Sequence, residues 1–199
     1  MILVGPNCFG IISTACSLCA TMPPLFPKPG PFAVVSQSGN IGFSIVQRLI
    51  SKGFGISKLI SYGNEADLHL ENYLEYLAED DETKVILSYI EGLKEGRSFF
   101  ETAKKVTQKK PIVTLKAGCT SAGAKAAKSH TSALAGSDAI FDSVCKQAGI
   151  IRVRDMDEIF NVGAALLHQP LPRGKRVGIV TAGGGWGVLG ADACVSAGL

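Results

Sequence analysis

Short apolar runs alternate with amphipathic segments along most of this 199-residue chain. Runs such as Phe32–Ser36 and Val85–Ile90 have the length and composition of buried strands. Segments with helical spacing of apolar side chains follow them, as in residues 40–53. Buried strands that alternate with helices are typical of parallel sheets covered on both faces. The sequence therefore predicts an α/β fold built on a doubly wound parallel sheet.

The alternation predicts the individual elements by residue range. Predicted strands cover residues 32–36, 56–61, 85–90, 111–115 and 150–153, and predicted helices cover residues 40–53, 68–79, 96–109, 137–148 and 155–168. Residues 2–12 are predicted to be a final strand and turn without partner strands, and residues 174–181 to begin a new strand. One strand and one helix cannot form a domain, so we expect the chain to be a fragment.

The bulk composition excludes several classes of protein. The chain is 46% hydrophobic and 19% charged, as in ordinary globular proteins, and its net charge of +3 is too small to indicate a nucleic-acid partner. We expect no membrane partner and no secretory signal, because apolar runs of spanning length and a charged leader are absent. Cys16 and Cys19 form a single CxxC without a second pair, so we expect no metal site. Isolated cysteines fit a reducing compartment, which predicts a cytoplasmic protein.

Ligands of doubly wound sheets bind at the carboxyl ends of the strands, so candidate residues are sought there. Ser36, Ser38, Gly39 and Asn40 follow the first predicted strand and open a helix, where N–H groups and hydroxyls favour an anion. Simple capping of the helix is the alternative. Glu91 follows the third strand, at a place where its carboxylate would orient an imidazole. A capping or surface carboxylate is the alternative there.

His130 lies in a stretch rich in Gly, Ala and Ser, which predicts an exposed loop that carries one imidazole. A neutral imidazole acts as a nucleophile and forms covalent intermediates. The other two histidines fall in ordinary helical patterns. Taken alone, an exposed loop histidine is more often without chemistry than catalytic.

A second glycine turn contains Gly184, Gly185 and Gly187 and also precedes a helix-like segment. Residues 185–190 match GxGxxG, the pattern of dinucleotide-binding turns. The acidic ribose ligand expected about 20 residues later lies beyond the sequence. The broader interpretation is another helix N-terminus that receives a phosphate.

Together these motifs resemble the ADP-forming acyl-CoA synthetases, relatives of succinyl-CoA synthetase. The resemblance rests on GPNCFGI, SQSGN, YGNEADL, YIEG, KSHTSALAGSDAIFD and TAGGGWGVLG. It implies a flavodoxin-like domain of an acid–thiol ligase (acetate–CoA ligase, ADP-forming), which interconverts acyl-CoA, ADP and phosphate with acid, CoA and ATP. It also implies that His130 is phosphorylated on a swinging loop and that Glu91 orients it. Two helix N-termini would receive the phosphoryl group, with Ser36, Ser38, Gly39 and Asn40 at one and Gly184, Gly185 and Gly187 at the other.

The resemblance also implies a domain organisation. Residues 1–22 would end a CoA-binding Rossmann-like domain, 23–31 would be a proline-rich linker, 32–169 the phosphohistidine domain, and 170–199 a linker and the start of a second flavodoxin-like domain. CoA and ATP or ADP with Mg²⁺ would serve the full-length protein, whose CoA-binding and ATP-grasp domains lie elsewhere in it or in a partner subunit. The substrates would be phosphate and a small carboxylic acid or its acyl-CoA. We expect this part alone to bind no cofactor tightly and to be inactive.

The sequence does not specify which acyl group is used, whether the nucleotide is ADP or GDP, or in which direction the reaction runs. It also does not specify whether the full-length protein is one fused chain or separate subunits, or its oligomeric state, for which a homodimer is one option. A regulatory domain of a CoA-dependent protein acetyltransferase is one alternative, although such relatives typically replace the histidine. A dinucleotide-binding module is another, but it leaves His130, SQSGN and YIEG unexplained. A scaffold fragment without chemistry is the third.

Overall fold

A computed structural model describes residues 1–120, 123, 125, 137–170 and 174–199. The chain divides into two compact units, Met1–His168 and Gln169–Leu199. The first unit contains a seven-stranded sheet, and the second contains one helix.

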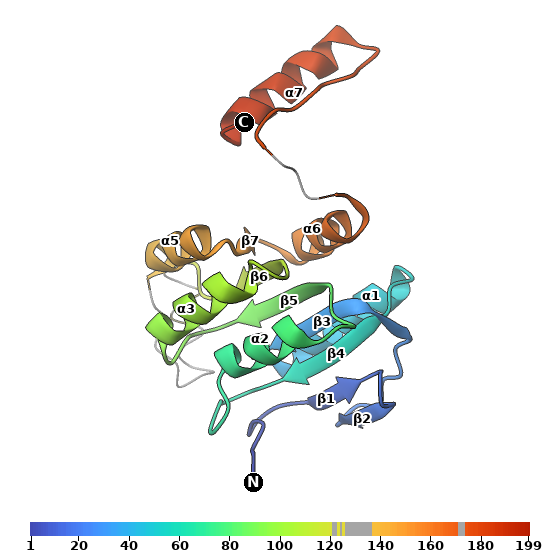
Figure 1. Cartoon of the computed structure of the whole chain (residues 1–199), viewed down its shortest axis with the longest axis vertical. Coiled ribbons are helices and arrows are strands. Elements are labelled where there is room, and N and C mark those ends of the chain that lie inside the picture. The colour runs from blue at the N-terminus through green and yellow to red at the C-terminus, as the bar shows by residue number, and fades with distance from the viewer. Residues whose placement is uncertain (121–122, 124, 126–136, 171–173) are drawn as a thin grey trace. The chain divides into compact units, whose positions relative to one another are not determined.

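The sheet of the first unit has the strand order β2-β1-β4-β3-β5-β6-β7 (Figure 1). Its five strands from β3 to β7 are parallel to one another. Numbered among themselves, they follow the order 2-1-3-4-5 of flavodoxin-like folds. The predicted doubly wound parallel sheet is thereby confirmed. The strands are β1 (Gly10–Ser13), β2 (Leu18–Thr21), β3 (Pro29–Ser36), β4 (Ile56–Ser61), β5 (Val85–Ile90), β6 (Ile112–Lys116) and β7 (Ile151–Val153).

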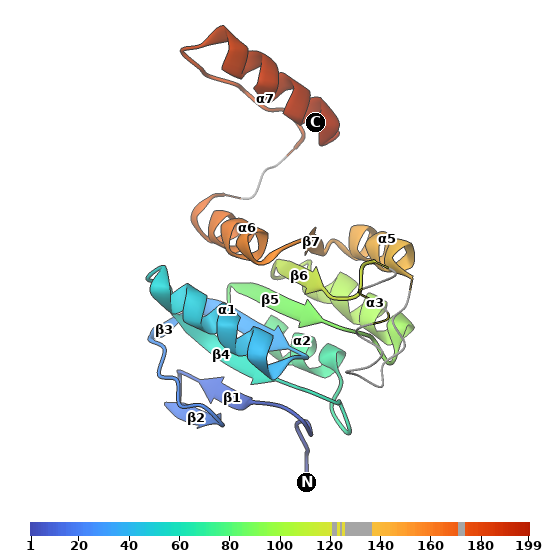
Figure 2. The ribbon, with the colours of Figure 1, turned by 180° about the vertical axis from the view of Figure 1, so that it is seen from behind.

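Helices cover both faces of the sheet. Figure 1 shows α2 (Leu70–Glu79) and α3 (Gly96–Val106) in front of the strands, and Figure 2 shows α1 (Gly39–Ser51) in front from the opposite side. The helix α5 (Asp138–Ala148) packs on α3, and α6 (Met156–His168) packs on β5 and β6. Each of these helices lies within a few residues of its predicted range.

The strand side chains alternate between two apolar cores, one on each face. Ala33 and Ile86 belong to the core that α2, α3 and α5 cover. Val34, Leu87 and Val113 belong to the core that α1 and α6 cover. All five are fully buried, which explains why the strands are apolar runs instead of alternating apolar and polar residues.

The first residues of the chain correct one prediction. Residues 2–12 were expected to be a strand without partners, but β1 pairs antiparallel with both β4 and β2. Residues 1–22 therefore extend this sheet at one edge, and β3 begins at Pro29, inside the predicted linker. The assignment of residues 1–22 to a CoA-binding domain stays a prediction, as do the other domain boundaries.

The second unit corrects another prediction. Residues 174–181 were expected to begin a strand, but no strand is formed there among the described residues. A strand needs a hydrogen-bonding partner, and the described residues of this unit supply only the helix α7 (Gly184–Ser196). Trp186, Val188 and Leu189 of α7 are exposed within the unit. In the described part of the chain no helix is long and apolar enough to cross a bilayer.

Candidate functional site

The strand order reverses between β3 and β5, because the chain leaves β3 toward β4 on one side and later returns to β5 on the other. Ligands of open α/β sheets bind at the carboxyl ends of the strands beside such a switch point. SQSGN runs from the last residue of β3 into α1, and YIEG runs from the last two residues of β5 into the turn that follows. The fold therefore brings two of the predicted motifs to one place.

The SQSGN turn is held by two short-range hydrogen bonds. Ser36 Oγ donates to the Ser38 carbonyl over 2.6 Å, and Ser38 Oγ accepts from the Ile41 N–H at 3.4 Å. Ser38 is thus the N-cap of α1, with the extended backbone that this position requires. Ser36 is fully buried, so any effect it has on an anion acts through the shape of the turn.

The absence of a side chain at two glycines allows Phe9 and Ser36 to pack closely against the first residues of α1. A Cβ on Gly39 would lie 2.3 Å from Cδ1 of Phe9, and a Cβ on Gly42 would lie 2.7 Å from Cβ of Ser36. Gly39 therefore has a packing reason besides its predicted phosphate-binding role. Asn40 is exposed, and the backbone N–H groups of Gly39 and Asn40 have no acceptor within the helix.

Gln37 connects the two motifs. Its Oε1 accepts hydrogen bonds from the Glu91 N–H at 2.8 Å and the Gly92 N–H at 3.0 Å. Its own backbone N–H donates to the Tyr89 carbonyl at 3.1 Å. The α1 N-terminus and the Glu91 turn are thus joined across the switch point by one side chain. The sequence analysis did not single out Gln37, because its contacts are made with residues more than 50 positions away.

Glu91 is half-buried at the end of β5, as predicted for a carboxylate at this edge. Its charge acts on two tyrosines. Burial, followed by the charges of Glu65 and Glu91, raises the pKa of Tyr62 well above its ordinary value. Burial, followed by the Glu91 charge, raises the pKa of Tyr89 to about 12. Both phenols therefore stay neutral, and Tyr62 Oη donates to the Tyr89 carbonyl at 3.4 Å.

The loop after β4 receives the first residues of the chain. The Asn64 N–H donates to the Pro6 carbonyl and the Ala66 N–H to the Gly5 carbonyl, each at 2.9 Å. The Phe9 N–H donates to Ser61 Oγ, also at 2.9 Å. The GPNCFG and YGNEADL motifs therefore lie together beside the SQSGN turn. The local sequence contained no signal for this long-range docking.

Glu65 in the same loop is another residue that the sequence analysis did not single out. It is only 3% exposed, and its Oε1 accepts from the Leu70 N–H at the start of α2. Burial raises the pKa of its carboxyl, although that hydrogen bond opposes the rise. Glu65 thus caps α2 and lies close enough to affect Tyr62.

The predicted nucleophile, His130, lies outside the described residues, so its role stays a prediction. Gly184, Gly185 and Gly187 all lie within the first turns of α7. Dinucleotide-binding glycines instead form the turn between a strand and its helix. Since α7 begins at Gly184 and residues 174–183 directly before it form no strand, the strand–turn–helix arrangement of a dinucleotide-binding turn is not seen there.

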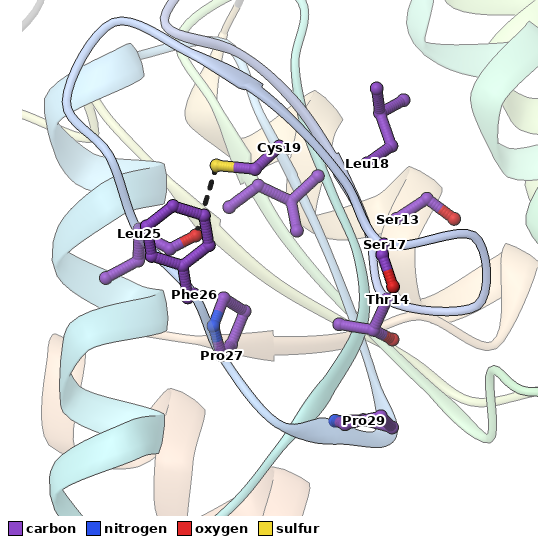
Figure 3. Close-up of a pocket in the computed structure, with 10 residues that line it drawn as sticks. Ser13, Thr14, Ser17, Leu18, Cys19, Leu25, Phe26, Pro27 and Pro29 are labelled. Atoms are coloured by element: carbon purple, nitrogen blue, oxygen red, sulfur yellow. Dashed lines mark hydrogen bonds between the residues drawn. The ribbon is translucent and has the colours of Figure 1, made fainter.

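Metal ligands and cavities elsewhere in the described residues add nothing to the site at the switch point. Among the described residues, no group of three His, Cys, Asp or Glu side chains is arranged to hold a metal ion. A cavity of about 230 Å³ lies beside β1, where Cys19 Sγ donates to the Leu25 carbonyl (Figure 3). It is smaller than most ligand pockets and reaches Pro29 at the amino end of β3. It therefore lies away from the switch point.

A family model and several known proteins match the sequence of this chain. The family model described as "Succinyl-CoA ligase like flavodoxin domain" matches residues 29–166. The α subunit of acetate–CoA ligase (ADP-forming) I of Pyrococcus furiosus is 44% identical over all 199 residues, which cover 43% of that protein. Acetate–CoA ligase (ADP-forming) of Methanocaldococcus jannaschii is 44% identical over 97% of this chain and 27% of its own length.

A solved structure has the same fold. Acetyl-coenzyme A synthetase 1 of Ca. Korarchaeum cryptofilum, in complex with phosphate and ADP, matches the whole chain with a TM-score of 0.91 and 39% identity. The chain covers 43% of that protein and thus spans less than half the length of these relatives. Because the family model covers more than half of the chain, the predicted resemblance is confirmed: the chain belongs to the family of succinyl-CoA ligase-like flavodoxin domains.

Proposed function

We propose that the protein to which this chain belongs is an ADP-forming acyl-CoA synthetase, and that this chain supplies its phosphoryl-carrying domain. The observation that supports the proposal most directly is the meeting of the α1 N-terminus with the Glu91 turn at the switch point. An anion-favouring helix start and a carboxylate suited to orient an imidazole are the two elements that a phosphohistidine needs.

In the proposed reaction, phosphate attacks the acyl carbon of acyl-CoA, and CoA leaves as the acyl phosphate forms. An imidazole nitrogen of His130 then attacks phosphorus, which releases the carboxylic acid. Transfer of the phosphoryl group from His130 to ADP gives ATP and restores the histidine. Phosphoryl transfer depends mainly on positioning and on stabilisation of charge, and this domain supplies both at the α1 N-terminus.

Glu91 would act on His130 and not on the phosphate. A carboxylate that accepts a hydrogen bond from one ring nitrogen fixes the tautomer, which leaves the other nitrogen free to attack. The backbone of Glu91 is itself held by Gln37. The backbone that bears the carboxylate therefore has a defined position relative to the α1 N-terminus.

The phosphoryl group would be held by N–H donors instead of a cation. It carries about two negative charges, and the first turn of a helix presents N–H groups and a partial positive charge. Gly39 and Asn40 supply these N–H groups in α1. We propose that Gly184, Gly185 and Gly187 at the start of α7 supply a second set.

Mg²⁺, the nucleotide and CoA would be bound by other parts of the protein or by a partner subunit. A small carboxylic acid such as acetate is the proposed acyl substrate, since ligases of acetate are among the relatives.

Phosphorylation of the full-length protein tests the proposal. The wild type is incubated with γ-labelled ATP and Mg²⁺ beside His130→Ala and the matched control His168→Gln, which changes an exposed histidine on α6. Base-stable, acid-labile label is expected on the wild type and on His168→Gln, and none on His130→Ala. An intact, nucleotide-binding wild type that takes up no label would refute the proposal and favour the acetyltransferase-type or non-catalytic alternatives.

A further inference from the structure

Arg152 on β7 carries a guanidinium that lies almost fully inside the first unit. Its side chain is 5% exposed, and the guanidinium carbon lies 5.4 Å from the centre of the Phe141 ring. Its Nε is buried and has no hydrogen-bond partner among the described residues. A buried ion pair contributes little net stability, because desolvation of the charges offsets their attraction. The burial of Arg152 therefore calls for a reason besides stability.

The two terminal nitrogens of Arg152 bind two places that lie apart along the chain. Nη2 donates to Cys119 Sγ at 3.3 Å and to the Asp138 carboxylate. Nη1 donates to the Asp138 carbonyl at 3.3 Å and to the Asp142 carboxylate at 3.2 Å. Cys119 follows β6, and Asp138 is the first residue of α5. One side chain thus joins the end of a strand to the beginning of the next helix.

The contact with Cys119 fixes the chain beyond the end of the sheet. The last hydrogen bond that ties this strand to β5 is donated by the Ala117 N–H to the Ile90 carbonyl at 2.9 Å. Beyond it, the Cys119 thiol donates to the Lys116 carbonyl at 2.9 Å, while its sulfur accepts from Arg152. Arg152 therefore holds the chain as far as Cys119.

The segment between Cys119 and Asp138 contains His130. It leaves β6 beside the Glu91 turn, because the last residue of β6 pairs with the last residue of β5. Fixing both ends of a segment restricts the conformations that are open to the residues between them. Accurate placement matters for a nucleophile, since an error of about 1 Å costs up to about 100-fold in rate.

We propose that Arg152 is a positioning residue for the phosphorylation of His130, because it joins Cys119 to Asp138 and so fixes both ends of the segment that contains the histidine. This inference rests on the proposed function and adds to it a residue that acts through the backbone and not on the phosphate. A guanidinium suits this role, because its planar fork of N–H donors reaches several acceptors at once.

The substitution Arg152→Lys separates charge from bridging. A lysine keeps the positive charge, but its single ammonium cannot reproduce the fork that spans both ends of the segment. Arg154→Lys is the matched control, because Arg154 lies 3.6 Å from Asp138 and 3.8 Å from Asp142. Its side chain is 59% exposed, and in the described part of the chain no hydrogen bond joins it to Cys119.

The assay incubates the full-length protein with Mg²⁺ and γ-labelled ATP at several concentrations and follows base-stable label with time. For Arg152→Lys we expect the maximal rate of labelling to fall about tenfold to 100-fold. The ATP concentration that gives half of this rate should change less than about twofold, because no nucleotide contact is altered. Arg154→Lys should label as the wild type does. A merely structural arginine would change the amount of protein that takes up label and leave the rate constant of the folded fraction unchanged.

Wild-type labelling rates in Arg152→Lys, or an equal fall in Arg154→Lys, would overturn this inference and leave the proposed function intact. If Arg152→Lys does not fold, Asp138→Ala beside Asp142→Ala decides, since Asp138 ends the segment and Asp142 lies one turn further into α5. Slower labelling of Asp138→Ala alone supports the inference, and any other result overturns it. A folded wild type that takes up no label would instead refute the proposed function itself.

Discussion

The contact between Phe9 and Gly39 makes a quantitative prediction about how the first residues of the chain hold the start of α1. A Cβ on Gly39 would lie 2.3, 2.6 and 3.0 Å from three atoms of the Phe9 ring. Carbon atoms in contact prefer a separation of about 3.5–4.0 Å. In Gly39→Ala the ring therefore has to retreat by more than about 1 Å or the helix start has to move.

The expected cost follows from two opposing terms. Overpacking of this kind costs about 1–3 kcal/mol, and alanine in place of glycine in a helix returns at most about 1 kcal/mol. With the full gain applied, we therefore expect Gly39→Ala to lower the free energy of unfolding by up to about 2 kcal/mol. In a Phe9→Ala background the clash is gone, so the same change should be neutral or slightly stabilising. The coupling energy between the two positions should thus be about 1–3 kcal/mol.

Urea unfolding of the four proteins of this cycle, followed by far-ultraviolet circular dichroism, measures the coupling energy. Phe9→Ala alone should also be destabilising, because the half-buried ring packs edge-on against Phe43 at 6.3 Å between centroids. A coupling energy below about 0.3 kcal/mol, the usual scatter for independent sites, would refute the docking of Phe9 on Gly39.

Two further predictions concern buried groups of the first unit. Asp80→Asn should cost about 1.5–3 kcal/mol in urea unfolding, because it leaves the buried Lys58 ammonium with the more exposed Glu82 as its charged partner, whereas Glu101→Gln in the exposed pair with Arg97 should have little effect. Burial opposes the ionised form of Asp80, but hydrogen bonds from Thr83 and Lys58 lower the pKa of its carboxyl. The contribution of Asp80 to the free energy of unfolding is therefore present above about pH 4 and is lost as the pH falls through the pKa of Asp80 in the folded protein. A free energy of unfolding that does not change with pH below about pH 4 would contradict this. In thiol mapping with iodoacetamide at pH 8, Cys16 should react early and Cys145 late. Cys16 is exposed and a hydrogen bond with Ser13 lowers the pKa of its thiol, whereas burial raises the pKa of Cys145 to about 12. Early labelling of Cys145 in the folded protein would contradict its burial in the apolar core.

The sheet and its helices could be predicted from the sequence because the necessary signal is local. Each parallel strand is a short apolar run, and each helix has apolar residues at helical spacing. The β4 and β5 ranges agree with the structure to the residue. The position of Glu91 after β5 followed from the same pattern, since a residue that ends a parallel strand faces the carboxyl edge.

Long-range pairing could not be predicted in the same way. The antiparallel pairing of β1 with β4 joins residues more than 40 positions apart, and nothing in residues 10–13 specifies that partner. The predicted strand at residues 174–181 failed for the converse reason. Its apolar residues suit a strand, but a strand forms only where a neighbour supplies hydrogen bonds. Gln37 escaped notice because a glutamine after a strand carries no local signal of its distant contacts.

At the carboxyl edge of the sheet, residues without reactive groups should affect the site as much as the candidate catalytic residues do. Gly63 has a left-handed backbone, with a φ of +55°, and a Cβ there would lie 2.2 Å from the Pro6 carbonyl oxygen. Any side chain at this position would therefore separate GPNCFG from the loop after β4, even if its backbone strain were tolerated. Undocking would also strain the position of Phe9 beside α1, because Phe9 follows the displaced residues directly and its N–H donates to Ser61 Oγ at the end of β4. The donor groups at the α1 N-terminus thus depend on a chain of contacts that begins in a glycine with no chemistry of its own.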